Sequence, residues 1–415
     1  MKQASRLVLL TGVLVMIATA AQGAGFAIWE MGIKSSGMGG VATASAGDPA
    51  AIFYNPAGLA RLDGAQLSLD LTAIDITTEF SGVAPHPGHG VTERLADPFF
   101  LLPQFYVTAP VGERFALGLG FNTPYGLSVE WADPETFTGR HVATFTDLKT
   151  YFVTPSVAWR ATDRMSLGFG LNLVMAEVEL NRNIVEILGN PTEVGKVSIQ
   201  GDNDLELGYN FGLLVDMGPR TTLGLNVKSR IDLELAGDAD FTPFTGYEAV
   251  IPADGPVETE LPLPSLVSIG VSHRFGDRLR VEFNFNRIQW SAFETLDLHF
   301  PESPEADESI REEYANTSQF RLGVEYQATP SLVLRAGGVR DETPQPTGSC
   351  GPVLPDADRT GISLGASWCR GAVTLEAYNL FLFLDEREVR DNFDGYQGDY
   401  RTYTNLMGAG LTYHF

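Results

Sequence analysis

The sequence predicts an all-β fold: a transmembrane antiparallel β-barrel of about 14 strands with an N-terminal plug, or hatch, inside the lumen. Three observations lead to this prediction. Residues 1–24 have the composition of an export signal, apolar and polar residues alternate along much of the chain, and the last segment, 407–415, alternates and closes on the aromatic Phe415. A period of two marks strands with one apolar face, and export followed by such strands is typical of outer-membrane barrels.

Residues 1–24 are expected to be a cleaved signal peptide. Lys2 and Arg6 precede an apolar run that ends among small residues such as Ala24, which is the order of a secretory signal. The alternative is a transmembrane helix, but the run from 7 to 21 is shorter than the ~20 apolar residues that a helix needs to span a bilayer. No later stretch is apolar enough for such a helix, so we expect strands to cross the membrane.

The composition fits one barrel better than several soluble domains. The chain has 415 residues, is 44% hydrophobic and contains 44 glycines. Alternating strands keep the mean hydropathy near zero even when one face contacts lipid. The net charge of −24 argues against a nucleic-acid partner. A soluble β-sandwich is the alternative fold, but it does not explain strands of this length.

Residues 25–63 are expected to form the plug. They are rich in Gly, Ala and Ser and show no sustained alternation. Roughly fourteen strands enclose a wider lumen than that of an eight-stranded barrel, which side chains fill. The lumen is therefore either an open pore or filled by this segment. Its apolar residues are candidates to line a ligand pocket, although they would also serve to pack the plug against the wall: Phe26, Ile28, Trp29, Ile52 and Phe53.

Residues 64–415 are expected to form the barrel. Short turns rich in Gly, Pro and Asp alternate with longer polar connections, as in barrels with short periplasmic turns and long outer loops. In the clearest strand, Leu205, Leu207 and Tyr209 should face lipid. The expected strands are 64–80, 99–110, 115–131, 149–161, 165–181, 204–217, 221–237, 265–275, 279–299, 316–328, 332–341, 358–368, 372–390 and 402–415.

The third expected strand, 115–131, contains a break. Outward alternation from Phe115 to Phe121 meets Pro124 and Gly126. Proline removes a donor from the ladder, and glycine in a strand marks a kink or bulge. A barrel tolerates such a break where the freed backbone groups meet protein or water. The break predicts either an opening in the wall or a bend without function.

Several motifs carry a resemblance to a known family. They are Gly25-Phe26, Ser36-Gly37-Met38-Gly39-Gly40, Tyr54-Asn55-Pro56-Ala57-Gly58, Asn122-Thr123-Pro124-Tyr125-Gly126-Leu127, Arg340-Asp341-Glu342-Thr343-Pro344 and Asp356-Ala357-Asp358-Arg359. In these motifs the chain resembles the FadL family of outer-membrane long-chain fatty-acid transporters. The resemblance covers nearly the whole chain after the signal.

The resemblance implies a function and a site. A family member carries hydrophobic molecules passively across the bacterial outer membrane as a monomer among membrane lipid and lipopolysaccharide, without a cofactor. The ligand, captured at the cell surface, would leave sideways through a gap at the kinked third strand. The plug motif would pack near this kink, and the residues concerned are Asn55, Pro56 and Ala57 for the motif and Asn122, Thr123, Pro124, Tyr125 and Gly126 for the kink. A gated porin for small polar solutes is the alternative, and a structural or adhesin-like barrel is a third interpretation.

A fatty-acid carboxylate needs a cation, and alternation places Lys228, Arg321 and Arg335 inward. Each is a candidate carboxylate partner, but each would equally pair with an inward carboxylate or anchor the plug. The chain also has acidic residues (Ala176-Glu177-Val178-Glu179) where the family has basic ones, and only a short loop at 182–203. An uncharged hydrocarbon is therefore as compatible as a fatty acid.

No pattern predicts catalysis or a metal centre. The six histidines are scattered, and His86 and His89 have no third ligand nearby. The acidic run 302–313 is expected to be a solvated loop rather than a divalent-cation site. Cys350 and Cys369 should stay unpaired, because about ten strand residues at ~3.3 Å each separate them and a disulfide needs Cα atoms within ~7 Å.

Overall fold

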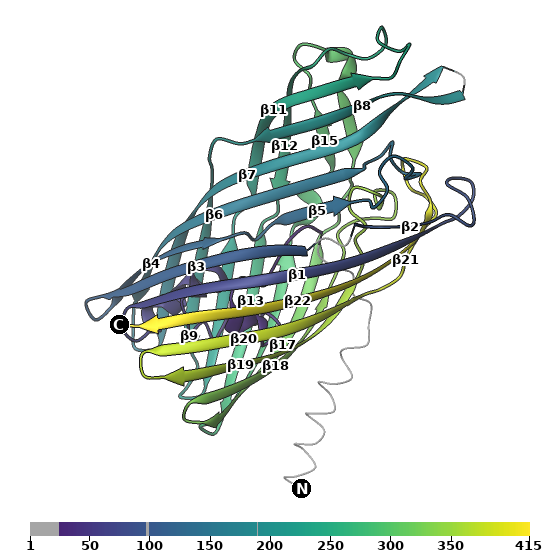
Figure 1. Ribbon diagram of the computed structural model, residues 1–415. Coiled ribbons are helices and arrows are strands. Elements are labelled where there is room, and N and C mark those ends of the chain that lie inside the picture. The colour runs from purple at the N-terminus through teal and green to yellow at the C-terminus, as the bar shows by residue number, and fades with distance from the viewer. Residues whose placement is uncertain (1–24, 97–98, 189) are drawn as a thin grey trace.

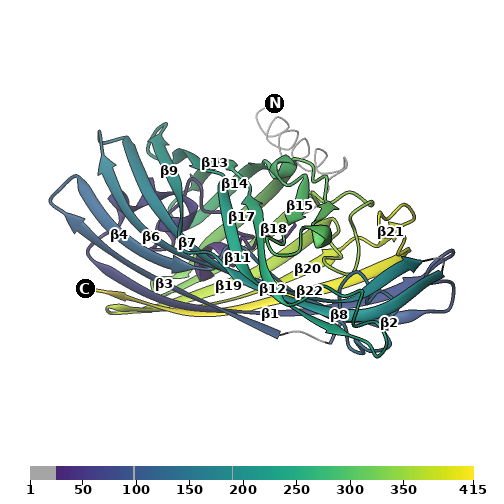
Figure 2. The ribbon, with the colours of Figure 1, turned by 90° about the horizontal axis from the view of Figure 1, so that it is seen from above.

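The computed structural model describes residues 25–96, 99–188 and 190–415, so the expected signal peptide lies outside the described residues. Within them, 14 strands close into a tilted antiparallel barrel (Figure 1, Figure 2). The predicted fold class is therefore confirmed. Across the same described ranges, no helix is both long and apolar enough to cross a bilayer.

The wall follows the chain order around the barrel. Strand β22 pairs with β1 from Gln66↔His414 to Gly82↔Gly398 and closes the ring. The wall strands are β1 (Gln66–Gly82), β3 (Phe99–Val111), β4 (Phe115–Asn122) with β5 (Gly126–Glu130), β6 (Phe145–Arg160), β7 (Met165–Leu188), β9 (Glu206–Asp216), β10 (Thr221–Lys228), β13 (Leu266–Phe275), β14 (Leu279–Ile288), β17 (Thr317–Thr329), β18 (Leu332–Asp341), β19 (Arg359–Arg370), β20 (Val373–Leu384) and β22 (Gly398–His414).

Further strands raise one side of the wall above the rest (Figure 1). Strands β8, β11 and β12 continue β9, β10 and β13 beyond short breaks and pair with one another. The additional elements are β2 (Thr92–Arg94), β8 (Asn190–Asp202), β11 (Ile231–Pro243), β12 (Gly255–Leu263), η2 (Trp290–Ala292), β15 (Thr295–Leu298), η3 (Pro304–Ala306), β16 (Glu308–Arg311) and β21 (Arg387–Val389).

The expectation that residues 182–203 and 238–264 are polar connections between strands is therefore wrong. Residues 182–203 form the β7–β8 hairpin, and 238–264 contain most of the β11–β12 hairpin. The apolar positions of these hairpins, such as Val197 and Val257, are buried on one face. Their outer faces are charged rather than apolar, which is why their alternation was hard to distinguish from a polar loop.

The alternation of the wall strands is as expected. Leu205, Leu207 and Tyr209 are 49%, 59% and 49% exposed on the outside of β9, where lipid would contact them. Gly208, between Leu207 and Tyr209, and Asn210, after Tyr209, are buried inside. The cysteine prediction is also confirmed, since Cys350 and Cys369 form no disulfide.

The N-terminal segment, residues 25–63, runs inside the ring of strands (Figure 1). It contains α2 (Ile33–Ser36), α3 (Ala51–Tyr54) and η1 (Pro56–Arg61), and nearly all of it is buried. Cross-strand pairs of wall glycines let its backbone come close. These glycine pairs are Gly168↔Gly212, Gly224↔Gly270 and Gly323↔Gly337.

The close approach explains why these wall positions are glycine. A Cβ atom on Gly224 would overlap the carbonyl of Thr43, and one on Gly337 would overlap the backbone of Met38. A larger residue would have to push the segment or the wall aside. The glycine pairs thus fix residues 33–61 against strands on several sides of the barrel.

Candidate functional site

The wall is interrupted between β3 and β5, and we call this interruption the first seam. Strand β4 pairs with β3 up to Phe105↔Phe121. Beyond the kink, β5 forms its ladder with β6, from Gly126↔Lys149 to Glu130↔Phe145, and its end is also bonded on the other side, where the Ala96 amide donates to the Glu130 carbonyl at 2.9 Å. Residues 99–104 of β3 keep only their ladder to β1. In the described wall, no ladder joins 99–104 to 126–130.

The N-terminal segment satisfies the backbone groups freed by this break. The Ile28 amide donates to the Pro124 carbonyl at 2.8 Å, and the Gly126 amide donates to the Phe26 carbonyl at 3.0 Å. The Thr150 hydroxyl donates to the Tyr125 carbonyl at 2.6 Å. Buried backbone groups need such partners, so residues 26–28 act as a short substitute strand at the kink.

A cavity of about 570 Å³ passes through the first seam. Its lining includes Phe99 and Leu101, which are 59% and 56% exposed on the outer face. It also includes Phe100 and Leu102, which pack against the apolar cluster on the lumen side. Because neighbouring strand residues point to opposite faces, a cavity lined by both sets crosses the wall.

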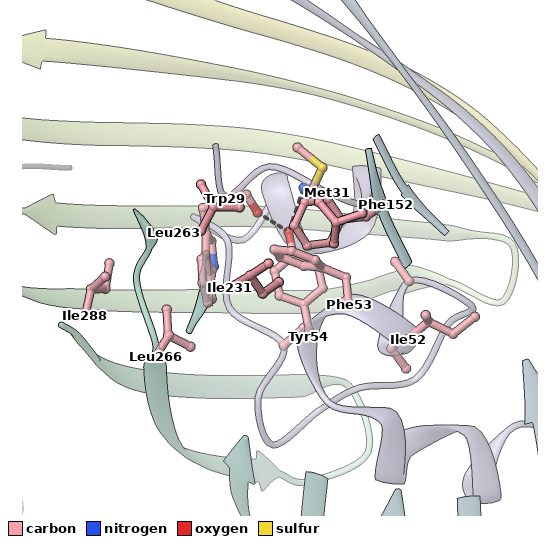
Figure 3. Close-up of a cluster of buried hydrophobic side chains, with 14 of the residues drawn as sticks. Trp29, Met31, Ile52, Phe53, Tyr54, Phe152, Ile231, Leu263, Leu266 and Ile288 are labelled. Atoms are coloured by element: carbon pink, nitrogen blue, oxygen red, sulfur yellow. Dashed lines mark hydrogen bonds between the residues drawn. The ribbon is translucent and has the colours of Figure 1, made fainter. Parts of the chain in front are cut away.

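A second, small pocket of about 40 Å³ lies deeper in the lumen. Figure 3 shows the apolar side chains around it, contributed by the N-terminal segment and by the wall. Those labelled there that line the pocket are Trp29, Ile52, Phe53, Phe152, Ile231, Leu266 and Ile288. Ile28 and Tyr125 line both spaces, so these residues separate the pocket from the wall-crossing cavity.

Lys228 is the cation of the small pocket. Its ammonium lies 3.1 Å from the centroid of the Phe53 ring and 5.3 Å from that of Trp29. Within the described ranges, no carboxylate lies within ion-pair distance of it. A partly buried ammonium over aromatic rings is attracted by their π faces, and it is still available to an anionic group.

Arg321 and Arg335 are engaged differently. Arg321 contacts Glu30 at 3.3 Å and donates to the Gly39 carbonyl at 2.8 Å, so it ties the N-terminal segment to β17. Arg335 contacts Glu325 at 2.9 Å and Glu376 at 3.6 Å. The structure places both guanidinium groups in ion pairs, unlike Lys228.

Arg359 was not among the expected site residues. It lines the wall-crossing cavity and donates to the Gly25 carbonyl at 3.4 Å, while its Nε has no acceptor. The sequence offers one signal for it, the Asp356–Arg359 motif. That motif carried the resemblance but indicated no role for the arginine.

The plug motif, residues 55–57, does not pack at the kink but against other strands of the wall. The Asn55 amide donates to the carbonyls of Thr43 at 2.7 Å and Leu213 at 3.2 Å. Ala57 packs over Gly168. The structure thus places Asn55, Pro56 and Ala57 against β7, β9 and β10, whereas residues 26–28 contact the kink. Ile52 connects the two regions, because it packs over the β4 glycines next to the kink.

Metal binding finds no support in the residues that the structure describes, since none of them form a group of three His, Cys, Asp or Glu side chains suited to an ion. The acidic run 302–313 lies around η3 and β16 and is largely exposed. His299, which directly follows β15, contacts Asp307 at 2.9 Å. These groups form local surface contacts.

Comparison with known proteins agrees with this geometry. The family described as "Outer membrane protein transport protein (OMPP1/FadL/TodX)" matches residues 14–415. Outer membrane protein P1 of Haemophilus influenzae is 26% identical over 98% of both chains, and the long-chain fatty acid transport protein of Escherichia coli is 24% identical over 96% of both.

Solved structures show the same fold. A Pseudomonas aeruginosa FadL homologue has a TM-score of 0.85 at 22% identity and covers 94% of this chain and 100% of its own. The Pseudomonas putida toluene transporter TodX has a TM-score of 0.77 at 17% identity and covers 95% and 99%. At these identities, the likeness is one of fold.

Proposed function

Because the chain belongs to the OMPP1/FadL/TodX family of outer-membrane transport proteins, we propose that it passively carries hydrophobic molecules across the bacterial outer membrane and releases them sideways through the first seam. The wall-crossing cavity carries this proposal, because it connects the lumen with the lipid-facing surface. Relatives named for long-chain fatty acids and for toluene support a hydrophobic ligand. We assign no catalytic residue and no cofactor.

The proposed path begins at the outer loops and reaches the Lys228 pocket. From there a ligand passes Ile28 and Tyr125, enters the wall-crossing cavity and moves into the membrane. The N-terminal segment acts as the plug on this path, because it closes the direct way down the lumen. Each CH₂ group that leaves water gains about 0.8 kcal/mol, so an acyl chain moves into the bilayer without an energy source.

The unpaired ammonium of Lys228 favours a ligand with an anionic head, such as a fatty acid. Its contact with Phe53 and Trp29 places the charge at the apolar pocket, where a carboxylate would form a charge-assisted hydrogen bond. An uncharged hydrocarbon is the second candidate, because the rest of the pocket is largely apolar. We propose that the protein works as a monomer surrounded by lipid and lipopolysaccharide.

Filling the seam tests the proposed route. Ser128 lies on β5 and lines the wall-crossing cavity, so Ser128→Trp should obstruct it, while Ser128→Ala is the matched control. The measurement is transfer of a fluorescent long-chain fatty acid through the purified protein into lipid vesicles. Ser128→Trp should reduce transfer to the level of protein-free vesicles, and Ser128→Ala should leave it unchanged. Full transfer by a correctly folded Ser128→Trp barrel would refute lateral release here.

A further inference from the structure

The wall contains a second interruption of the same kind, between β9 and β11. Strand β9 pairs with β7 up to Glu206↔Val174, and β11 pairs with β12 from Ile231↔Leu263 onward. In the described residues, no ladder joins 205–208 to 231–235. We call this interruption the second seam.

Both ends of the second seam are closed by hydrogen bonds. At the lower end, the Ser229 amide donates to the Tyr209 carbonyl at 3.0 Å, and the Tyr209 amide donates to the Ser229 hydroxyl at 2.9 Å. At the upper end, the ladder between β8 and β11 starts at Asp202↔Ala236. The interruption is therefore short and has fixed limits.

One side chain fills the second seam. Ile231 is only 5% exposed, and a Cβ atom on Gly208 would lie 2.5 Å from its Cδ1. Glycine at position 208 thus makes room for Ile231 in the wall. Ile231 and Ser229 also line the small pocket that contains Lys228, so these two residues lie between that pocket and the second seam.

The outer surface changes character at this seam. The β9 side presents Leu205 and Leu207, which are exposed and apolar. The β11 side presents Arg230, which contacts Asp232 at 2.5 Å and Glu260 at 3.6 Å. An apolar band that ends in charged side chains marks the membrane boundary of a barrel. The second seam therefore lies level with the lipid headgroups of the outer leaflet.

We infer that the second seam is a lateral port between the outer leaflet and the Lys228 pocket, gated by Ile231. Its ligand is an amphiphile with an apolar chain and an anionic head, because the chain would lie along Leu205 and Leu207 while the head passes Arg230 and reaches Lys228. This inference rests on the proposed function, and it adds to it a second passage through the wall with its own gate.

The test uses the obstructed first seam as its background. In the full-length Ser128→Trp protein, the additional change Ile231→Ala should open the second seam and recover transfer of the fluorescent fatty acid into vesicles. The matched control is Ser128→Trp with Leu266→Ala. Leu266 lines the same pocket but begins β13, where it pairs with Lys228 of β10 on one side and Ile288 of β14 on the other. Heat-modifiable migration in electrophoresis confirms that each variant is a folded barrel.

The outcomes separate the two proposals. Recovery with Ile231→Ala but not with Leu266→Ala supports the second port. Equal recovery in both variants indicates a general leak of the pocket and overturns the port, as does the absence of recovery. If Ser128→Trp alone transfers at the wild-type rate, the proposed release route fails instead. The port is then tested with Ile231→Ala as a single change, which should speed transfer of the acid more than that of its methyl ester, and an equal effect on both would overturn it.

Discussion

The two parts of the N-terminal segment are held in contrasting ways. Residues 33–61 press their backbone onto the glycine pairs of the wall, and Asn55 adds bonds to strand carbonyls. Residues 25–31 lie beside the wall-crossing cavity and reach the kinked strand through two backbone hydrogen bonds. The first part is held by backbone packing on the wall, whereas the second is held largely by side chains, such as the pair of Glu30 with Arg321 and the hydrogen bond from Arg359 to the Gly25 carbonyl. We propose that the first part acts as a fixed stopper and the second as a movable gate.

Removing the N-terminal segment, stopper and gate together, should have the largest effect. Deleting residues 25–60 would empty the lumen of a barrel of this size, so we expect ion conductance in planar bilayers to rise by roughly tenfold or more. The full-length protein measured in the same bilayers is the control. Unchanged conductance would mean that the N-terminal segment does not close the lumen.

A single glycine should be enough to disturb the stopper. Gly337→Val places a side chain against the backbone of Met38, and overpacking of this kind costs about 1–3 kcal/mol. Gly338→Val is the matched control, since a Cβ atom there meets nothing closer than 3.8 Å. We expect a lower thermal midpoint and a leak current for Gly337→Val alone. Equal behaviour of both variants would contradict the fixed-stopper interpretation.

The Lys228 pocket sharpens the comparison, because Trp29 comes from the gate and Phe53 from the stopper. Lys228→Met keeps the length of the side chain but removes its charge. We expect about tenfold weaker binding of a long-chain fatty acid, or about 1.4 kcal/mol, and little change for its methyl ester. Fluorescence displacement with both ligands measures this difference. An equal loss of affinity for acid and ester would show that the ammonium does not distinguish the two head groups.

The smallest expected effect concerns residues 308–316, which contain Glu312 and lie near the start of the gate. Burial raises the pKa of Glu312 to about 8, with Asp394 nearby adding to the shift. Glu312 precedes Tyr314, whose ring packs on Trp290, and Gly25 rests on Trp290.

A raised carboxyl pKa means that the folded loop holds its proton more tightly than the unfolded chain does. The stability that this bound proton gives to the folded loop is fully present below the ordinary pKa near 4.5, and it is lost as the pH rises toward 8. Hydrogen exchange of residues 308–316, corrected for intrinsic rates, should therefore show weaker protection at high pH. Glu312→Gln should abolish this pH dependence. A persistent dependence in that variant would assign it to another group.

Local patterns in the sequence predicted most of the wall. Alternation located the strands, and Pro124 with Gly126 located the break, because a strand period and a missing ladder donor are visible within a few residues. Because the outer face of β11 is charged, its sequence does not indicate a hairpin, which becomes evident only from the pairing of β11 with β8 and β12.

The features that depend on register between distant strands could not be predicted. Gly208 is an ordinary inward glycine until Ile231, on another strand, is found against it. The glycine pairs are another example, since Gly323↔Gly337 is a product of strand pairing. Of the expected cations, the sequence placed three inward, but it contained nothing to show that Arg321 and Arg335 would find carboxylates while Lys228 would not.

The closure of β1 on β22 has a consequence for biogenesis. The N-terminal segment is made before any strand, yet its resting places are distributed over strands from β4 to β22. Once the ring is complete, a chain packed this tightly has no way in from the side. We expect the segment to be seated while the last strand is still joining the first, so that assembly in the membrane and sealing of the lumen are one event.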